Sequence, residues 1–216
     1  MKAFVSWSSG KDCMYALYRF VNRAEGEVIC LLNMSDADSD RSRSHGISNS
    51  LIKRQAEALP YPLWQCPITL GSYETSLKGA IGKLKEQGVG AGIFGDIYLE
   101  EHRSWIERVC GEMDIKAIFP LWGEDTSKLI RKFVADGFRS ITVAVSKQHL
   151  PKEYVGRVID DSFIDELTDN YPYMDLCAEH GEYHSYVFDA PIFSYQIAFE
   201  KGIITEDDKN YFIELK

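Results

Sequence analysis

The chain has 216 residues, of which 45% are hydrophobic and 12% aromatic, so it can bury a substantial core. Its formal net charge of −9 argues against binding along a nucleic-acid backbone, which needs clustered Lys and Arg, and we expect no nucleic-acid partner. Because no stretch approaches the roughly 18 apolar residues of a membrane span and the five cysteines form no C-x-x-C pair, we expect a cytoplasmic protein with reduced thiols and no membrane partner.

Strand-like and helix-like segments alternate through about the first 120 residues, which is typical of a parallel sheet covered by helices. The expected strands are residues 3–7, 27–34, 63–68, 91–95 and 116–119. The expected helices follow the first four strands, with apolar residues at helical spacing from Cys13 to Ala24 and over residues 47–59, 73–87 and 97–113. The pattern predicts an α/β fold with a five-stranded parallel sheet.

The alternation changes after Pro120-Leu121-Trp122. One more helix is expected over residues 126–136, followed by a long strand over 138–146 and by strands at 183–188, 192–200 and 211–215. We therefore predict two domains, a larger α/β domain over residues 1–124 and a smaller α+β domain over residues 125–216.

A polar turn, Ser8-Ser9-Gly10-Lys11-Asp12, separates the first strand from the first helix. Such a turn leaves the first amides of the helix unpaired, and together with the Lys11 ammonium they favour phosphate binding. Asp12 is placed to hold Mg²⁺ between phosphate oxygens. On these residues alone, a helix capped by Ser8 or Ser9 remains the alternative. Neither G-x-x-x-x-G-K-[ST] nor G-x-G-x-x-G is present.

The turn resembles the PP-loop of ATP pyrophosphatases, S-G-G-K-D-S. The resemblance implies a doubly wound α/β fold of the adenine-nucleotide alpha-hydrolase type, which binds ATP and releases pyrophosphate. Two positions differ from the motif. Ser9 replaces a glycine, which is a mild change if its φ is ordinary, and Cys13 replaces a serine whose hydroxyl would donate to a phosphate.

Further segments of the chain resemble the diphthine–ammonia ligase family. They are Phe94-Gly95-Asp96-Ile97, Leu99-Glu100-Glu101-His102-Arg103, Pro120-Leu121-Trp122, Gly156-Arg157, and Glu179-His180-Gly181-Glu182-Tyr183-His184-Ser185 with Asp189-Ala190-Pro191. The resemblance implies an ATP-dependent ligase that converts an acid and ammonia into an amide, AMP and pyrophosphate. In archaea and eukaryotes the acid is diphthine on elongation factor two, at the last step of diphthamide synthesis. The family also has bacterial relatives, in organisms without diphthamide, so the acid stays open.

The resemblance also implies a nucleotide site. We expect ATP and Mg²⁺ as cofactors, with Asp12 and Asp96 as the Mg²⁺ ligands, because both follow strands whose carboxyl ends border one crevice. Asp96 could instead be a helix N-cap. The expected ATP-binding residues are Ser8, Ser9, Gly10, Lys11, Asp12, Cys13, His45, Gly46 and Gly95. The expected catalytic residues are Lys11, Asp12, Asp96 and Glu182.

A short acidic turn before a strand is the expected acid site. Its predicted substrate-binding residues are Glu179, Gly181, Glu182, His184 and Ser185. Carboxylates suit a cationic amine or ammonia, and a histidine can move protons near neutral pH. Surface salt bridging is the alternative. Ala178 stands where the family often has glycine.

Several functions remain open besides this ligase. A PP-loop ATP pyrophosphatase acting on another carboxylate and a non-catalytic adenine-nucleotide sensor both keep the loop. A tRNA-thiolating enzyme would want cysteine pairs and a basic face, which the chain lacks. The expected partners are ATP, ammonium and a diphthine-bearing elongation factor, with a homodimer as one open arrangement.

Overall fold

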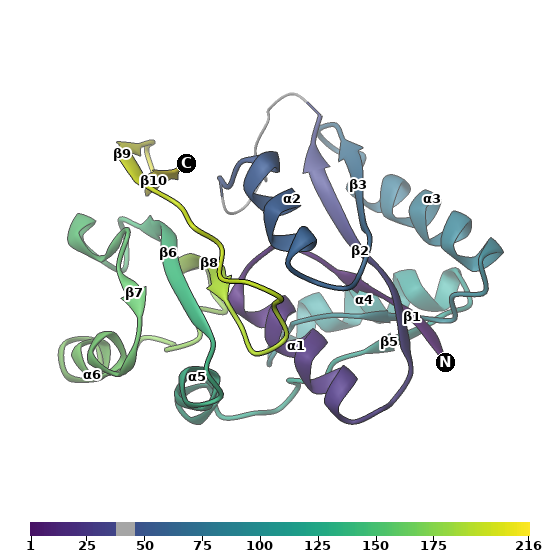
Figure 1. The fold of residues 1–216 in the computed structure, drawn as a ribbon, viewed down its shortest axis with the longest axis horizontal. Coiled ribbons are helices and arrows are strands. Elements are labelled where there is room, and N and C mark those ends of the chain that lie inside the picture. The colour runs from purple at the N-terminus through teal and green to yellow at the C-terminus, as the bar shows by residue number, and fades with distance from the viewer. Residues whose placement is uncertain (38–45) are drawn as a thin grey trace.

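The structure is a computed structural model that describes residues 1–37 and 46–216. Five strands make the first sheet: β1 (Lys2–Ser6), β2 (Glu27–Asp36), β3 (Leu63–Ile68), β4 (Ala91–Ile93) and β5 (Lys116–Ile118). All pairs are parallel and the order is β3-β2-β1-β4-β5. The predicted five-stranded parallel sheet is confirmed (Figure 1).

Helices cover both faces of this sheet. They are α1 (Lys11–Asn22), α2 (Asn49–Glu57), α3 (Tyr73–Glu86) and α4 (Glu100–Glu112). Strand side chains alternate between faces, so Val5 of β1 packs in one core with α1 and α2, while Phe4 packs in a second core with α3 and α4. The connections leave β1 and β4 toward opposite faces, which places a topological switch point between the carboxyl ends of these two strands.

The second half of the chain forms an antiparallel sheet with its own helices. Its elements are α5 (Thr126–Ala135), β6 (Arg139–Ser146), the short 3₁₀ helix η1 (Lys152–Tyr154), β7 (Val158–Ile159), α6 (Asp161–Asn170), β8 (Tyr183–Asp189), β9 (Lys201–Glu206) and β10 (Asn210–Leu215). Strand β6 pairs with β7 through residues 140–141 and with β10 through residues 144–146, and β10 pairs with β9. Strand β8 pairs with β6 along residues 139–145. The predicted smaller α+β part is confirmed.

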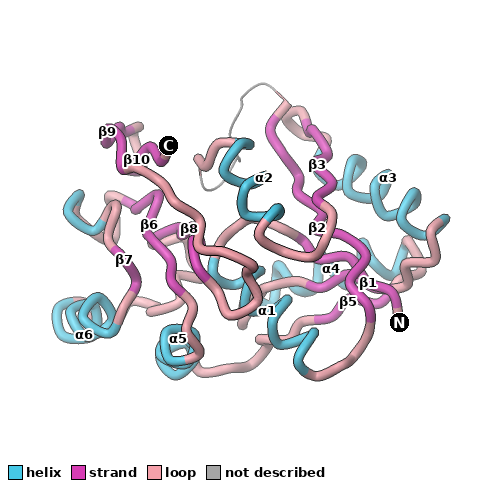
Figure 2. Tube along the Cα trace, in the orientation of Figure 1, coloured by secondary structure: helices cyan, strands magenta, loops and turns pink. Residues whose placement is uncertain are grey.

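Several elements of this half differ from the prediction, which includes neither the short strand β7 nor the strand β9. Helix α6 is absent from the predicted elements, although Asp160 caps it by accepting from the Phe163 amide at 2.9 Å. The strand predicted over residues 192–200 is wrong: Figure 2 shows loop between β8 and β9. The amides there bond to separate elements, since Ser194 donates to Ala58 and Ile197 to Phe188. Because these hydrogen bonds go to different elements, the segment does not pair with a strand along its length.

Two helices also differ in their ends. The helix predicted from residue 97 begins at Glu100, so residues 94–99 form a loop at the end of β4. The first helix ends at Asn22, and Ala24 has a positive φ of 51° in the following turn. None of the described helices has both the length and the apolar character that a bilayer-spanning helix needs.

Helix α1 lies between the two sheets and contacts both β1 and β8 (Figure 1). Tyr15 and Tyr18 project from it into an aromatic cluster with Phe133 and Phe138. The Tyr15 hydroxyl donates to Asp136 at 2.6 Å. One continuous core therefore joins the two halves.

We predict that Phe138→Ala lowers the free energy of unfolding of the whole chain by about 3–5 kcal/mol, because it leaves a cavity beneath α1. All four tryptophans, Trp7, Trp64, Trp105 and Trp122, lie in the first half. Urea unfolding followed by tryptophan fluorescence should therefore show a lower midpoint, coincident with circular dichroism. Ile203→Ala, at an exposed position, is the control. An unchanged fluorescence midpoint in Phe138→Ala would mean that the two halves unfold independently.

Candidate active site

The loop before α1 has a strained main chain. Ser9 has a φ of +71°, in the left-handed region that favours glycine, so its φ is not ordinary. Its carbonyl accepts hydrogen bonds from Gln55 Nε2 at 3.0 Å and from the Val187 amide at 3.1 Å. The Ser9 side chain is fully buried, and its hydroxyl has no hydrogen-bond partner among the residues that the structure describes. Replacing glycine at this position is therefore not a mild change.

Lys11 is buried beneath the loop. Its ammonium contacts both carboxylate oxygens of Asp12, at 2.9 and 2.8 Å, and donates to the Cys177 carbonyl. Its amide donates to Ser185 Oγ at 3.1 Å. Burial is the largest single effect and lowers the pKa of Lys11, but the charge of Asp12, the electrostatic effects of Tyr183 and Cys177 and the hydrogen bond to Asp12 together raise the pKa above its ordinary value, so the side chain stays an ammonium. Lys11 thus joins the loop to the residues before β8.

A cleft of about 830 Å³ opens at the carboxyl ends of β1 and β4. The predicted site residues that line it are Ser8, Asp12, Cys13, Gly95, Asp96, Glu179, Gly181 and His184. Most of these residues come from two segments, residues 8–13 and 179–184, which are far apart in sequence. The cleft lies at the switch point, where open α/β sheets bind ligands.

The other predicted site residues lie elsewhere. Ser9, Lys11 and Ser185 are buried and do not line the cleft, and Gly10 is the N-cap residue of α1. Glu182 lines a neighbouring cavity. Gly46 lies against Phe212 of β10, with a φ of +64°. His45 lies outside the described residues, so the structure says nothing of it.

Asp12 and Asp96 face the same cleft. Burial raises the pKa of Asp96, His102 at 3.6 Å lowers it, and the charge of Asp12 raises it further. In the described part of the chain no group of three or more His, Cys, Asp or Glu is arranged to hold a metal ion. Mg²⁺ commonly takes one or two carboxylates and completes its shell with phosphate oxygens and water. These two carboxylates fit that donor set.

Gly95 permits the contact between the two strand ends. A Cβ at this position would lie 2.8 Å from the Asp12 carbonyl carbon and 2.8 Å from the Cys13 nitrogen. Main-chain atoms cannot move aside cheaply, so a side chain would push the segment after β4 away from α1. The glycine therefore keeps Asp96 beside the first turn of α1.

The turn before β8 is organised by Asp175, which sequence reasoning missed. Its carboxylate accepts from the Cys177 amide at 3.1 Å, the Glu179 amide at 2.7 Å and the Tyr98 hydroxyl at 3.1 Å. An Asp two residues before a turn amide is a local signal for such bonding, but the Tyr98 contact has no signal in sequence. Ala178 has a φ of +58° here.

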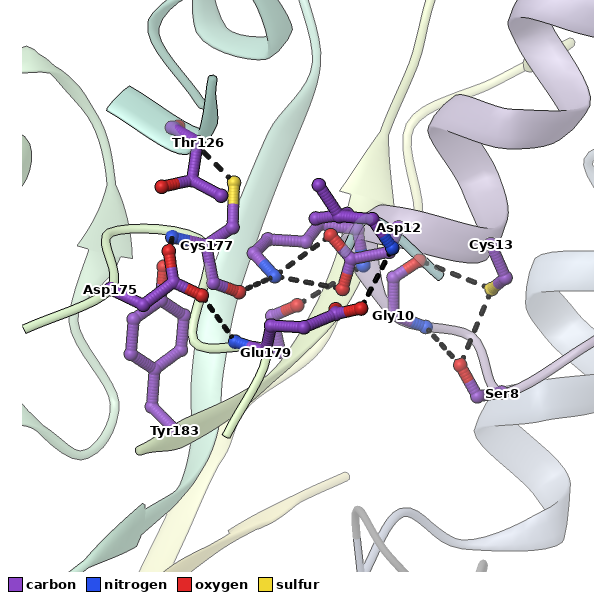
Figure 3. Close-up of polar contacts among 12 residues, drawn as sticks. Ser8, Gly10, Asp12, Cys13, Thr126, Asp175, Cys177, Glu179 and Tyr183 are labelled. Atoms are coloured by element: carbon purple, nitrogen blue, oxygen red, sulfur yellow. Dashed lines mark hydrogen bonds and ion pairs between the residues drawn. The ribbon is translucent and has the colours of Figure 1, made fainter. Parts of the chain in front are cut away.

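Glu179 connects this turn to the loop after β4. Its Oε1 accepts from the Ile97 amide at 2.7 Å (Figure 3 shows Glu179 beside Asp12). Burial raises the pKa of Glu179, the Ile97 bond lowers it, and the charges of Asp12 and Asp96 raise it. Burial and then Lys11 lower the pKa of His184 to about 4, so its imidazole is neutral near pH 7.

We predict that Ser9→Gly raises the free energy of unfolding by about 1 kcal/mol, because relief of left-handed strain and of a buried unpaired hydroxyl exceeds the added entropy of an unfolded glycine. Urea unfolding measures the change. Ala178→Gly relieves strain without removing a hydroxyl and should gain less. A Ser9→Gly variant that is less stable than the native chain would contradict the strain argument.

Comparison with known proteins gives matches over nearly the whole chain. Residues 1–117 match the diphthamide synthase N-terminal domain, and residues 125–216 match the diphthamide synthase C-terminal domain. A Rattus norvegicus relative is 27% identical over 218 residues, covering 88% of this chain and 79% of the relative. A Danio rerio relative is 25% identical over 226 residues, covering 93% and 88%.

A Homo sapiens relative is 25% identical over 214 residues, covering 88% of this chain and 79% of its own. All three relatives are named diphthine–ammonia ligase. The resemblance found in the motifs is confirmed by these matches, which include both halves of the chain. The chain belongs to the diphthamide synthase family.

Proposed function

We propose that the chain is an ATP-dependent, AMP-forming ligase that joins ammonia to a carboxylic acid, as the name diphthine–ammonia ligase describes for its relatives. One observation carries the proposal: the first turn of α1 and the carboxylates Asp12 and Asp96 border the same cleft as Glu179 and His184. A nucleotide and an acid held there would meet at the switch point.

The two halves of the chain have separate roles in this proposal. Residues 1–124 form an ATP-binding domain and residues 125–216 a smaller substrate-binding domain. The family matches to two domains support this division. The Lys11 ammonium donates to the Cys177 carbonyl, so it joins the proposed ATP-binding domain to the proposed substrate-binding domain.

The reaction has two steps. A carboxylate oxygen of the acid bonds to the α-phosphorus of ATP while the bond to the bridging oxygen breaks, and pyrophosphate leaves. The nitrogen of ammonia then bonds to the acyl carbon, the bond from that carbon to AMP oxygen breaks, and the nitrogen loses a proton. No bond to the protein is required.

Each nearby residue has a role that its position supports. The amides of Asp12 and Cys13 at the start of α1 would stabilise negative charge on phosphate oxygens, whereas the Lys11 amide already donates to Ser185. Asp12 and Asp96 would hold Mg²⁺, which neutralises phosphate charge when bound. Lys11 orients Asp12, since its buried ammonium pairs with that carboxylate. Glu179 and neutral His184 border the acid site, and Glu182 borders it from the neighbouring cavity.

A diphthine-bearing elongation factor is the acid donor that the relatives' name suggests. The cysteines Cys13, Cys30, Cys66, Cys110 and Cys177 are free thiols in the structure. That state supports the predicted cytoplasmic location. A homodimer stays a prediction.

Product analysis tests the function. We expect AMP and pyrophosphate from Mg²⁺–ATP when ammonium and diphthine-bearing elongation factor are both present, and amide on the factor by mass spectrometry. AMP release at the same rate with and without the factor would still support ATP pyrophosphatase chemistry, and it would point to another acid as the substrate. Tight ATP binding without cleavage would contradict the proposed catalytic function and favour a nucleotide sensor.

The two cleft carboxylates should be needed for turnover. We predict that Asp12→Ala and Asp96→Asn each slow AMP formation by about 10²–10³-fold, because each removes a carboxylate that would hold the Mg²⁺ needed to neutralise charge on the departing pyrophosphate. Asp208→Ala, in the exposed turn between β9 and β10, is the control and should keep native turnover. Near-native cleavage by Asp12→Ala would exclude the proposed nucleotide site.

A further inference from the structure

The loop after β4 positions Asp96, one of the two aspartates that line the cleft. Residues 94–99 belong to neither a helix nor a strand, although the Phe94 amide still donates to the Ile118 carbonyl of β5 at 2.9 Å. Buried main-chain groups outside helices and strands need partners from elsewhere in the fold. The position of the Asp96 carboxylate therefore depends on the tertiary contacts of its neighbours.

Ile97, the residue after Asp96, is held at three points. Its amide donates to Glu179 Oε1 at 2.7 Å, and its carbonyl accepts from the Gly123 amide at 2.8 Å. Its side chain is fully buried in the core that includes α1. On the other side of Asp96, Gly95 lies against the main chain of the first turn of α1. Asp96 is thus held between α1 and Glu179.

Tyr98 makes a second contact with the turn before β8. Its hydroxyl donates to Asp175 Oδ2 at 3.1 Å, and its ring lies edge-on to His180 with the ring centroids 5.5 Å apart. The same Asp175 oxygen accepts from the Glu179 amide at 2.7 Å. Asp175 therefore fixes both the Tyr98 side chain and the backbone of Glu179.

The contacts of Glu179 distinguish two roles for it, a ligand for the substrate and a support for Asp96. Its Oε1 accepts from the Ile97 amide, and this contact needs an acceptor oxygen but no negative charge. The charge itself is opposed, because Asp12 and Asp96 line the same cleft. The geometry therefore favours the role that uses the oxygen.

We propose that Glu179 is a positioning residue for the ligase reaction. Through the Ile97 amide it orients the loop that carries Asp96, and Asp175 supports it by accepting from both Glu179 and Tyr98. The proposal rests on the proposed ligase function. The turn before β8, in the second half of the chain, thus acts on a carboxylate of the candidate nucleotide site in the first half.

Amide hydrogen exchange, measured by NMR with neither nucleotide nor metal added, tests the contact. We expect the Ile97 amide to exchange about tenfold faster in Glu179→Ala, which removes its acceptor, than in the native chain. Glu179→Gln keeps an acceptor oxygen and should keep native exchange. The Phe94 amide, bonded to β5, is the internal reference and should not change in either variant. Native exchange of the Ile97 amide in Glu179→Ala would overturn the proposal.

Turnover tests the consequence for the reaction. We expect kcat for AMP formation to fall by about 10–100-fold in Glu179→Ala, with little change in the KM of the acid, because Asp96 loses its support. Glu179→Gln should have near-native kcat, since it keeps the acceptor. A Glu179→Gln variant as slow as Glu179→Ala, or a raised KM of the acid in both variants, would overturn the proposal in favour of a direct contact between the Glu179 charge and the substrate.

A tyrosine variant tests the support from Asp175. Tyr98→Phe removes only the hydroxyl that donates to Asp175 and keeps the ring beside His180. We expect kcat to fall several-fold and the Ile97 amide to exchange faster. Tyr195→Phe, at a half-exposed tyrosine that does not line the cleft, is the matched control and should behave as the native chain does. Equal rates in the two variants would overturn this part of the proposal.

The outcomes separate the positioning role from the function. A native chain that forms AMP, together with a Glu179→Ala variant that retains native kcat, would refute the positioning role and leave the ligase intact. A native chain that forms no AMP with any acid would instead refute the ligase, and with it any role of Glu179 in turnover.

Discussion

The buried Lys11 ammonium is the contact on which the arrangement of the site depends. It pairs with Asp12 in the loop before α1 and donates to the Cys177 carbonyl in the turn before β8. These segments are more than 160 residues apart in sequence, and one cation satisfies groups on both. Because a buried ammonium without partners is very costly, the loop and the turn are stable only together.

This coupling explains why the candidate nucleotide and acid sites share one cleft. Asp12, at the start of α1, and Glu179, in the turn before β8, both line the cleft. Glu179 also accepts a hydrogen bond from the Ile97 amide. The two halves of the chain also share the aromatic core around Tyr15 and Phe138. Polar contacts at the cleft and apolar packing beneath it therefore oppose the same separation of the two sheets.

Much of this architecture follows from local patterns in the sequence. Buried strands alternating with amphipathic helices specify the parallel sheet, and β3 has the predicted bounds of 63–68. The placement of Asp12 and Asp96 at one crevice follows from strand order alone. The contacts of Tyr98 and Asp175 do not, because they join residues 77 positions apart. The φ of Ser9 is likewise set by tertiary hydrogen bonds to Gln55 and Val187, which no local pattern records.

Two of the non-glycine residues with positive φ, Ser9 and Ala178, lie close in sequence to the two partners of Lys11, Asp12 and Cys177. Ser9 precedes the lysine by two positions, and Ala178 follows the carbonyl of Cys177 directly; both have positive φ. Such strain persists only where surrounding contacts determine the conformation. At Ser9 these are two hydrogen bonds to its carbonyl, and at Ala178 they are the bonds from the Cys177 and Glu179 amides to Asp175. The strained conformations are therefore held by contacts within the protein, so the cleft has its shape before any ligand enters.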